Sequence, residues 1–146
     1  MEIYTIGFTK TTAEDFFGRL NNAGVGRLLD IRLNNSSQLA GFAKARDLPY
    51  LLYELVGAQY EHQPLLAPSQ EMLSEFKMKR EMDWADYEFH FLRLLQERQA
   101  ETLLPPDYFE TKTALLCSEA TAEHCHRRLV CDYFAKFWPN LRVIHL

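Results

Sequence analysis

Reactive side chains gather around one predicted strand-to-helix turn. An apolar run from Thr113 to Cys117 ends in a thiol, and Glu119 follows it two positions later. Cys125, His126 and Arg127 then open a segment with a helical pattern. In an open α/β sheet, ligands bind beyond the carboxyl ends of the strands, where helix N-termini point N–H groups at anions. This turn is therefore a candidate site, although its residues do not by themselves name a reaction.

The two thiols of this turn allow two interpretations. Cys117 or Cys125 can be a nucleophile, because a helix N-terminus and the nearby Arg127 favour a thiolate. Alternatively, both are small buried residues, since free cysteine is among the most buried residue types. Cys131 lies deeper in the apolar helix and is predicted to pack in the core. Three cysteines are a poor basis for a secreted disulfide framework, so the sequence predicts reduced thiols.

Charged residues from a second predicted strand end are expected near the same turn. Glu119 can act as a general base or hold an arginine. Asp30 and Arg32 can complete a charge network with Glu119 and Arg127, and such a network can be structural or functional. His62, after a third predicted strand, is a candidate general acid or base, with a half-buried structural histidine as the alternative.

The spacing of the metal donors does not favour a metal site. Structural zinc sites usually show two closely spaced ligand pairs. Here Cys117 and Cys125 are eight positions apart, and Cys125 and His126 are adjacent, so on a helix they should point in different directions. The remaining donors considered are Glu119, His124 and His145. Motifs of phosphate-binding loops, dinucleotide-binding turns and zinc proteases are absent from the sequence. We expect no metal and no cofactor.

Strand-like and helical segments alternate along the chain. The predicted strands cover residues 2–6, 27–31, 59–62, 113–117 and 141–145. The predicted helices run from about Thr12 to Ala23, Pro49 to Gly57, Ser69 to Arg80, Trp84 to Glu101 and Thr121 to Phe137, with Thr11 and Glu14 as a capping box for the first. Alternating elements imply right-handed crossovers. The sequence thus predicts one α/β domain over residues 1–146, with three layers: a mostly parallel sheet of about five strands and helices on both faces.

Composition narrows the class of protein. The 146 residues are 47% hydrophobic and 25% charged, which is typical of a compact protein rather than a disordered one. No apolar run is long enough to span a membrane and no basic-then-apolar leader opens the chain, so we expect a cytoplasmic protein. With 16 basic and 20 acidic side chains the net charge is -4, which disfavours bulk nucleic-acid binding without excluding a local basic site. The oligomeric state does not follow from the sequence.

Seven separated motifs carry a family resemblance. They are Ile3-Tyr4-Thr5-Ile6-Gly7-Phe8-Thr9, Leu29-Asp30-Ile31-Arg32, Gly41-Phe42, Tyr60-Glu61-His62-Gln63-Pro64-Leu65, Leu115-Leu116-Cys117-Ser118-Glu119, Cys125-His126-Arg127 and Val143-Ile144-His145. In this order, over nearly the whole chain, they resemble the family catalogued as domain of unknown function 488. The resemblance implies these site positions: Gly7, Asp30, Arg32, His62, Cys117, Glu119, Cys125, His126 and Arg127.

The chain also departs from the family pattern. Phe8 stands where a histidine is common, Asn34 and Asn35 replace a proline-containing loop, and Leu66-Ala67 replaces a Gly-Gly pair. A family activity can therefore be weakened in this chain. The layout is also similar to that of rhodanese-like sulfurtransferases and cysteine phosphatases. Glu119 and the ten-residue separation of Cys117 from Arg127 disfavour the phosphatase interpretation.

The first functional hypothesis is an enzyme or enzyme-like domain that binds a small phosphorylated or nucleotide-like anionic ligand. Arg32 and Arg127 hold the anion, Glu119 is a base or orients an arginine, and Cys117 or Cys125 is a nucleophile or a polar wall. The alternatives are a non-catalytic binding or adaptor module with a structural charge network, and a nucleic-acid processing protein. Whether the chain is an enzyme stays open at this stage.

Overall fold

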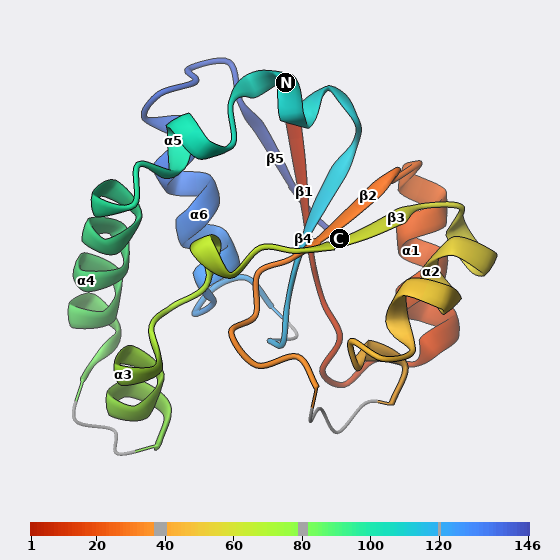
Figure 1. The fold of residues 1–146 in the computed structure, drawn as a ribbon, viewed down its shortest axis with the longest axis horizontal. Coiled ribbons are helices and arrows are strands. Elements are labelled where there is room, and N and C mark those ends of the chain that lie inside the picture. The colour runs from red at the N-terminus through yellow and green to blue at the C-terminus, as the bar shows by residue number, and fades with distance from the viewer. Residues whose placement is uncertain (37–40, 79–81, 120) are drawn as a thin grey trace.

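The computed structural model describes residues 1–36, 41–78, 82–119 and 121–146. Its centre is a five-stranded sheet in the order β3-β2-β4-β1-β5 (Figure 1). The strands are β1 (Glu2–Gly7), β2 (Arg27–Asp30), β3 (Gln59–His62), β4 (Thr113–Cys117) and β5 (Arg142–His145). All four strand pairings are parallel. The predicted α/β class and the predicted sheet are confirmed.

Helices cover both faces of the sheet. On one face lie α1 (Ala13–Ala23) and α2 (Leu48–Val56). On the other lie α3 (Gln70–Leu73), α4 (Trp84–Glu97), α5 (Ala100–Leu103) and α6 (His126–Ala135) (Figure 1). A π-helical turn over Ser74–Met78 follows α3, and short 3₁₀ turns cover Gly41–Ala43, Pro64–Leu66 and Pro106–Glu110. Within the described ranges, no helix has the length and apolar character needed to cross a membrane.

Local capping explains where the first two helices begin and end. The Thr12 hydroxyl accepts the backbone N–H of Asp15 at 3.1 Å, so Thr12, not Thr11, is the N-cap of α1. Gly24 ends α1 at φ 72° and Gly57 ends α2 at φ 76°. Both values lie in the left-handed region that glycine adopts without steric cost.

Two helix predictions were wrong in their bounds. The last helix begins at His126 rather than near Thr121, because Cys125 is extended (φ -131°, ψ 140°) and its sulfur is held at the end of β4, as described below. The predicted helix from Trp84 to Glu101 is two helices, because Gln99 is left-handed at φ 54°. The predicted helix end at Arg80 lies outside the described residues.

Strand register brings the three central strand ends together. Gly7 of β1 pairs with Cys117 of β4, and Asp30 of β2 pairs with Leu116 of β4 and His62 of β3. Alternate strand residues supply the two cores: Ile3, Leu29 and Leu115 lie in the core with α4 and α6, whereas Ile6, Leu28 and Leu116 lie in the core with α1 and α2. The candidate residues therefore stand at the carboxyl edge of a sheet that is covered on both faces.

Candidate functional site

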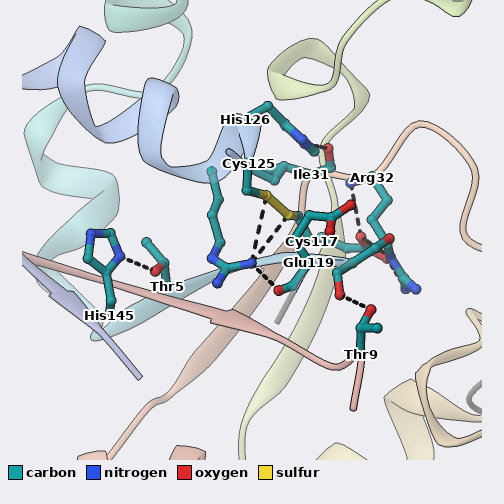
Figure 2. Close-up of a disulfide and its surroundings, with 12 residues drawn as sticks. Thr5, Thr9, Ile31, Arg32, Cys117, Glu119, Cys125, His126 and His145 are labelled. Carbon is teal, nitrogen blue, oxygen red and sulfur yellow. Dashed lines mark hydrogen bonds and ion pairs between the residues drawn. A yellow bond between two sulfur atoms is a disulfide. The ribbon is translucent and has the colours of Figure 1, made fainter. Parts of the chain in front are cut away.

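Cys117 and Cys125 form a disulfide (Figure 2). The expectation of reduced thiols was therefore wrong for these two residues. The chain leaves β4 at Cys117 and comes back eight residues later to start α6, and this return brings the second sulfur to the strand end. Both residues are buried, at 1% and 2% exposure. Cys131 is a buried free cysteine, as predicted, and burial raises the pKa of its thiol.

The guanidinium of Arg127 lies against this disulfide. Its Nη1 donates to the Glu119 carbonyl at 2.6 Å and to the sulfurs of Cys117 and Cys125 at 3.5 and 3.7 Å. Arg127 is 1% exposed, and burial lowers its pKa to about 10, so it stays charged at neutral pH. In the part of the chain that the structure describes, Arg127 forms no ion pair with a carboxylate. A buried positive charge therefore faces two sulfur atoms.

Gly7 provides the space in which these groups meet. A Cβ at this position would lie 1.7 Å from the Glu119 carbonyl oxygen and 2.7 Å from Nη1 of Arg127. Only a residue without a Cβ leaves room for this contact. Glu119 contacts Arg127 through its backbone carbonyl. The pKa of Tyr87 is raised mainly because Tyr87 is buried, and the negative charge of the Glu119 side chain raises it further.

Asp30 and Arg32 form a separate buried ion pair. The Asp30 carboxylate is fully buried and accepts from Nε of Arg32 at 2.8 Å, from Nη2 at 2.7 Å and from the Tyr60 hydroxyl at 2.5 Å. Nη2 of Arg32 also donates to the Ala43 carbonyl, and the Phe8 ring lies 5.2 Å from the guanidinium carbon. The structure thus pairs Arg32 with Asp30 and Arg127 with a backbone carbonyl. The Asp30–Arg32 pair therefore holds the end of β2 against the Ala43 backbone.

The ion pair predicts how stability depends on pH. Burial alone would raise the pKa of Asp30, but the hydrogen bonds and charge of Arg32 outweigh it and hold that pKa below its ordinary value of 3.8. The pair therefore contributes stability above about pH 4, and this contribution is lost as the pH falls through the folded-state pKa. We expect the difference in urea midpoint between wild type and Asp30→Asn to be constant above about pH 5 and to shrink toward pH 3. A difference that grows on acidification would contradict this assignment.

The two histidines predicted near the site bind backbone carbonyls. Nε2 of His126 donates to Ile31 at 2.6 Å (Figure 2), and Nε2 of His62 donates to Arg32 at 2.7 Å. A carbonyl oxygen only accepts, so in each ring the proton is on Nε2. His126 faces the pocket described next, whereas His62 is exposed and does not line it.

A pocket of about 190 Å³ opens beside the disulfide. Five predicted site residues line it: Arg32, Cys117, Glu119, Cys125 and His126. Gly7, Asp30 and Arg127 do not line it, but each contacts a residue that does. The structure therefore gathers eight of the nine predicted site residues at or behind one pocket, and leaves His62 outside.

An aromatic wall completes this pocket, and sequence reasoning missed it. Phe76, Trp84, Tyr87 and His124 also line it. The Trp84 ring stacks on Tyr87 at 5.2 Å and on His124 at 4.9 Å between ring centroids. Trp84 and Tyr87 are three residues apart on a helix, which is a spacing typical of core packing, so no sequence signal separates this wall from an ordinary core.

The three departures from the family pattern lie at or near the site. Phe8 is buried and packs on Arg32, and Asn34 lines the pocket. Leu66 is buried in the core beside α4. Phe8 and Leu66 are thus well packed, whereas Asn34 is exposed at the pocket.

One metal-compatible cluster is present within the described ranges. Cys117, Cys125 and His126 each offer a ligand atom, and these atoms lie within 4.8 Å of one another. The sequence argument that adjacent Cys125 and His126 diverge on a helix was wrong, because Cys125 precedes the helix in extended backbone.

Three comparisons with known proteins gave one match. A protein-family model described as a domain of unknown function, DUF488, matches residues 12–134. No curated protein and no solved structure matches the chain.

Proposed function

The chain belongs to the DUF488 family, and we propose that it is an enzyme that performs thiol–disulfide exchange on a small negatively charged ligand at the Cys117–Cys125 pair. One observation carries the proposal: the buried guanidinium of Arg127 donates hydrogen bonds to both sulfurs. Its charge is therefore placed where negative charge develops when the S–S bond breaks. Preorganised donors of this kind stabilise a developing anion strongly in a site shielded from water.

The exchange balances as two successive displacements. A ligand thiolate attacks one sulfur of the pair and forms a mixed disulfide, and the other sulfur leaves as a thiolate beside Arg127. A second ligand thiolate then attacks the ligand sulfur of the mixed disulfide. The ligand leaves as its own disulfide, and two electrons have passed to Cys117 and Cys125. The same two steps in reverse, with the ligand disulfide as the oxidant, oxidise the dithiol form of the protein.

An unsatisfied nitrogen of Arg32 at the pocket, and the buried charge of Arg127 behind the disulfide, support a negatively charged ligand. In the described part of the chain, Nη1 of Arg32 and Nε of Arg127 are buried without a hydrogen-bond partner. Arg32 lines the pocket, and Arg127 lies behind the Cys117–Cys125 disulfide, which also lines it. Asp30 neutralises Arg32, so Arg127 supplies most of the net positive field at the sulfurs.

Three thiols of similar size and different charge test the proposal. We expect 2-mercaptoethanesulfonate to reduce the Cys117–Cys125 disulfide faster, per thiolate, than neutral 2-mercaptoethanol, and cationic cysteamine to be the slowest. The sulfonate and ammonium groups differ by two unit charges, which near a partly shielded guanidinium corresponds to about a tenfold difference in rate at low ionic strength, and salt should reduce it. Rates are measured by quenched alkylation and mass spectrometry. The net charge of -4 would produce the opposite order.

Matched variants locate the effect. Arg127→Gln should remove the preference for the anionic thiol, whereas Arg93→Gln, which changes an exposed arginine on α4, should keep it. Because Arg127→Gln can also loosen the fold, circular dichroism is recorded for each variant. A wild-type rate that does not depend on thiol charge would refute the proposal without reference to any variant.

The burial of both cysteines favours one rival, a binding or adaptor module with a structural disulfide. Their exposures of 1% and 2% require a ligand to enter the pocket fully. The rival predicts that all three thiols reduce the disulfide at one common rate, set by unfolding of the chain. Reduction kinetics under native conditions therefore separate the two functions.

A further inference from the structure

Cys117, Cys125 and His126 hold soft ligand atoms at one point of the pocket. Their sulfur and nitrogen atoms lie within 4.8 Å of one another, although the residues come from a strand end, a helix N-cap and the first residue of that helix. Figure 2 shows the imidazole of His126 beside the two sulfurs. In a zinc site with Zn–S distances of about 2.3 Å and tetrahedral angles, ligand atoms are about 3.8 Å apart. Small side-chain movements are enough to reach that geometry once the sulfurs are no longer bonded.

The tautomer of His126 is the one that a metal ligand requires. Nε2 donates to the Ile31 carbonyl at 2.6 Å, so the lone pair of the neutral ring is on Nδ1. Metal-bound histidines almost always donate their other N–H to a carbonyl or carboxylate, which orients the ring. Here the acceptor is the Ile31 carbonyl, and the sheet fixes its position because Ile31 directly follows β2.

The charges around the cluster also fit. Two thiolates and a neutral imidazole carry a charge of -2, which a divalent cation neutralises. Nη1 of Arg127 already donates to both sulfurs and would keep these hydrogen bonds to metal-bound thiolates. Two sulfurs and one imidazole select zinc-like cations over magnesium or calcium, which prefer oxygen.

We propose that the dithiol form of this site binds one zinc-class divalent cation through Cys117, Cys125 and Nδ1 of His126, with the fourth coordination position open to the pocket. The inference rests on the proposed function in one respect, that the disulfide can be reduced in the folded chain. Binding displaces the proton of each sulfur that is still a thiol, whereas a sulfur that is already a thiolate binds directly. Oxidation of the two sulfurs by a small disulfide removes two electrons, re-forms the S–S bond and releases the cation, so disulfide and metal exclude each other.

Cobalt(II) is the probe for this site. The full chain is reduced with a phosphine, the new thiols are counted by alkylation and mass spectrometry, and cobalt chloride is titrated into both redox forms. We expect one cobalt per reduced chain with sulfur-to-cobalt charge-transfer absorption, release of at most two protons, and displacement by zinc chloride. The disulfide form should give no such absorption.

Variants assign the ligands. Cys131→Ala removes the third thiol and should leave cobalt binding unchanged, since Cys131 is buried in the core. His126→Gln keeps a donor for Ile31 but loses the ring nitrogen. It should weaken cobalt binding more than the roughly 10–100-fold that loss of an outer-shell partner costs. Cys125→Ser, with one sulfur left, should lose most of the charge-transfer band.

Each contrary result has a separate meaning. A reduced, folded chain without the charge-transfer band overturns the metal site and leaves the exchange function standing. Unchanged binding by His126→Gln overturns the proposed ligand set. A disulfide that no reductant opens in the folded chain overturns both proposals, and the thiol count shows this before any metal is added.

Discussion

Replacing Gly7 with alanine is expected to lower the free energy of unfolding by about 3 kcal/mol and to disrupt the site. The new methyl group would lie 1.7 Å from the backbone oxygen of Glu119, and a backbone atom cannot move away as a flexible side chain can. Relief requires the turn after β4 to shift, and that shift separates the Glu119 carbonyl from Arg127. The measurement is urea unfolding followed by circular dichroism, together with the thiol-charge preference of the disulfide.

Gly18→Ala is the matched control. Gly18 lies inside α1, and a Cβ there would meet nothing within 4 Å in the described structure. Because glycine inside a helix costs about 0.5–1 kcal/mol relative to alanine, this substitution should stabilise the chain. Equal stability of the two alanine variants would show that the close approach at Gly7 does not constrain the fold.

Asp30→Asn is expected to cost about 3–5 kcal/mol of stability. Asparagine keeps the size of the side chain but removes its charge, and the Arg32 guanidinium, at 3% exposure, then remains buried without a counter-charge. Breaking one side of a buried pair is costly for that reason, whereas replacing both partners is much less so. The double variant Asp30→Asn, Arg32→Met should therefore be more stable than Asp30→Asn alone.

An exposed ion pair provides the comparison. Arg93 and Glu97 lie 3.4 Å apart on α4 with side chains 65% and 62% exposed. Glu97→Gln should cost at most about 0.5 kcal/mol, because water and salt screen such pairs. If Asp30→Asn cost no more than Glu97→Gln, the pair at the end of β2 would have no role in holding the fold.

Features that depend on a few neighbouring residues could be predicted from the sequence. Thr12 and Gly24 bound α1 through local hydrogen bonds and a left-handed turn. Asp30 and Arg32 are two positions apart at a strand end, so their proximity was predictable, although the sequence also linked them to Glu119 and Arg127. The π-helical turn and the break at Gln99 were not predictable, because neither segment contains a glycine or proline that would mark a departure from the α-helix.

The chain by itself determined the α/β class, the approximate strands and the identity of the residues at the strand ends, since hydrophobic periodicity and capping act within one or two turns of chain. Only the tertiary structure decided which strand ends are neighbours, and so joined Cys117 to Cys125, set Gly7 against Glu119 and Arg127, and closed the pocket with Trp84 and Tyr87. These contacts connect segments that are far apart in sequence or lie on either side of a turn of irregular conformation. Their geometry results from the packing of helices on the sheet, and no local pattern of residues encodes it.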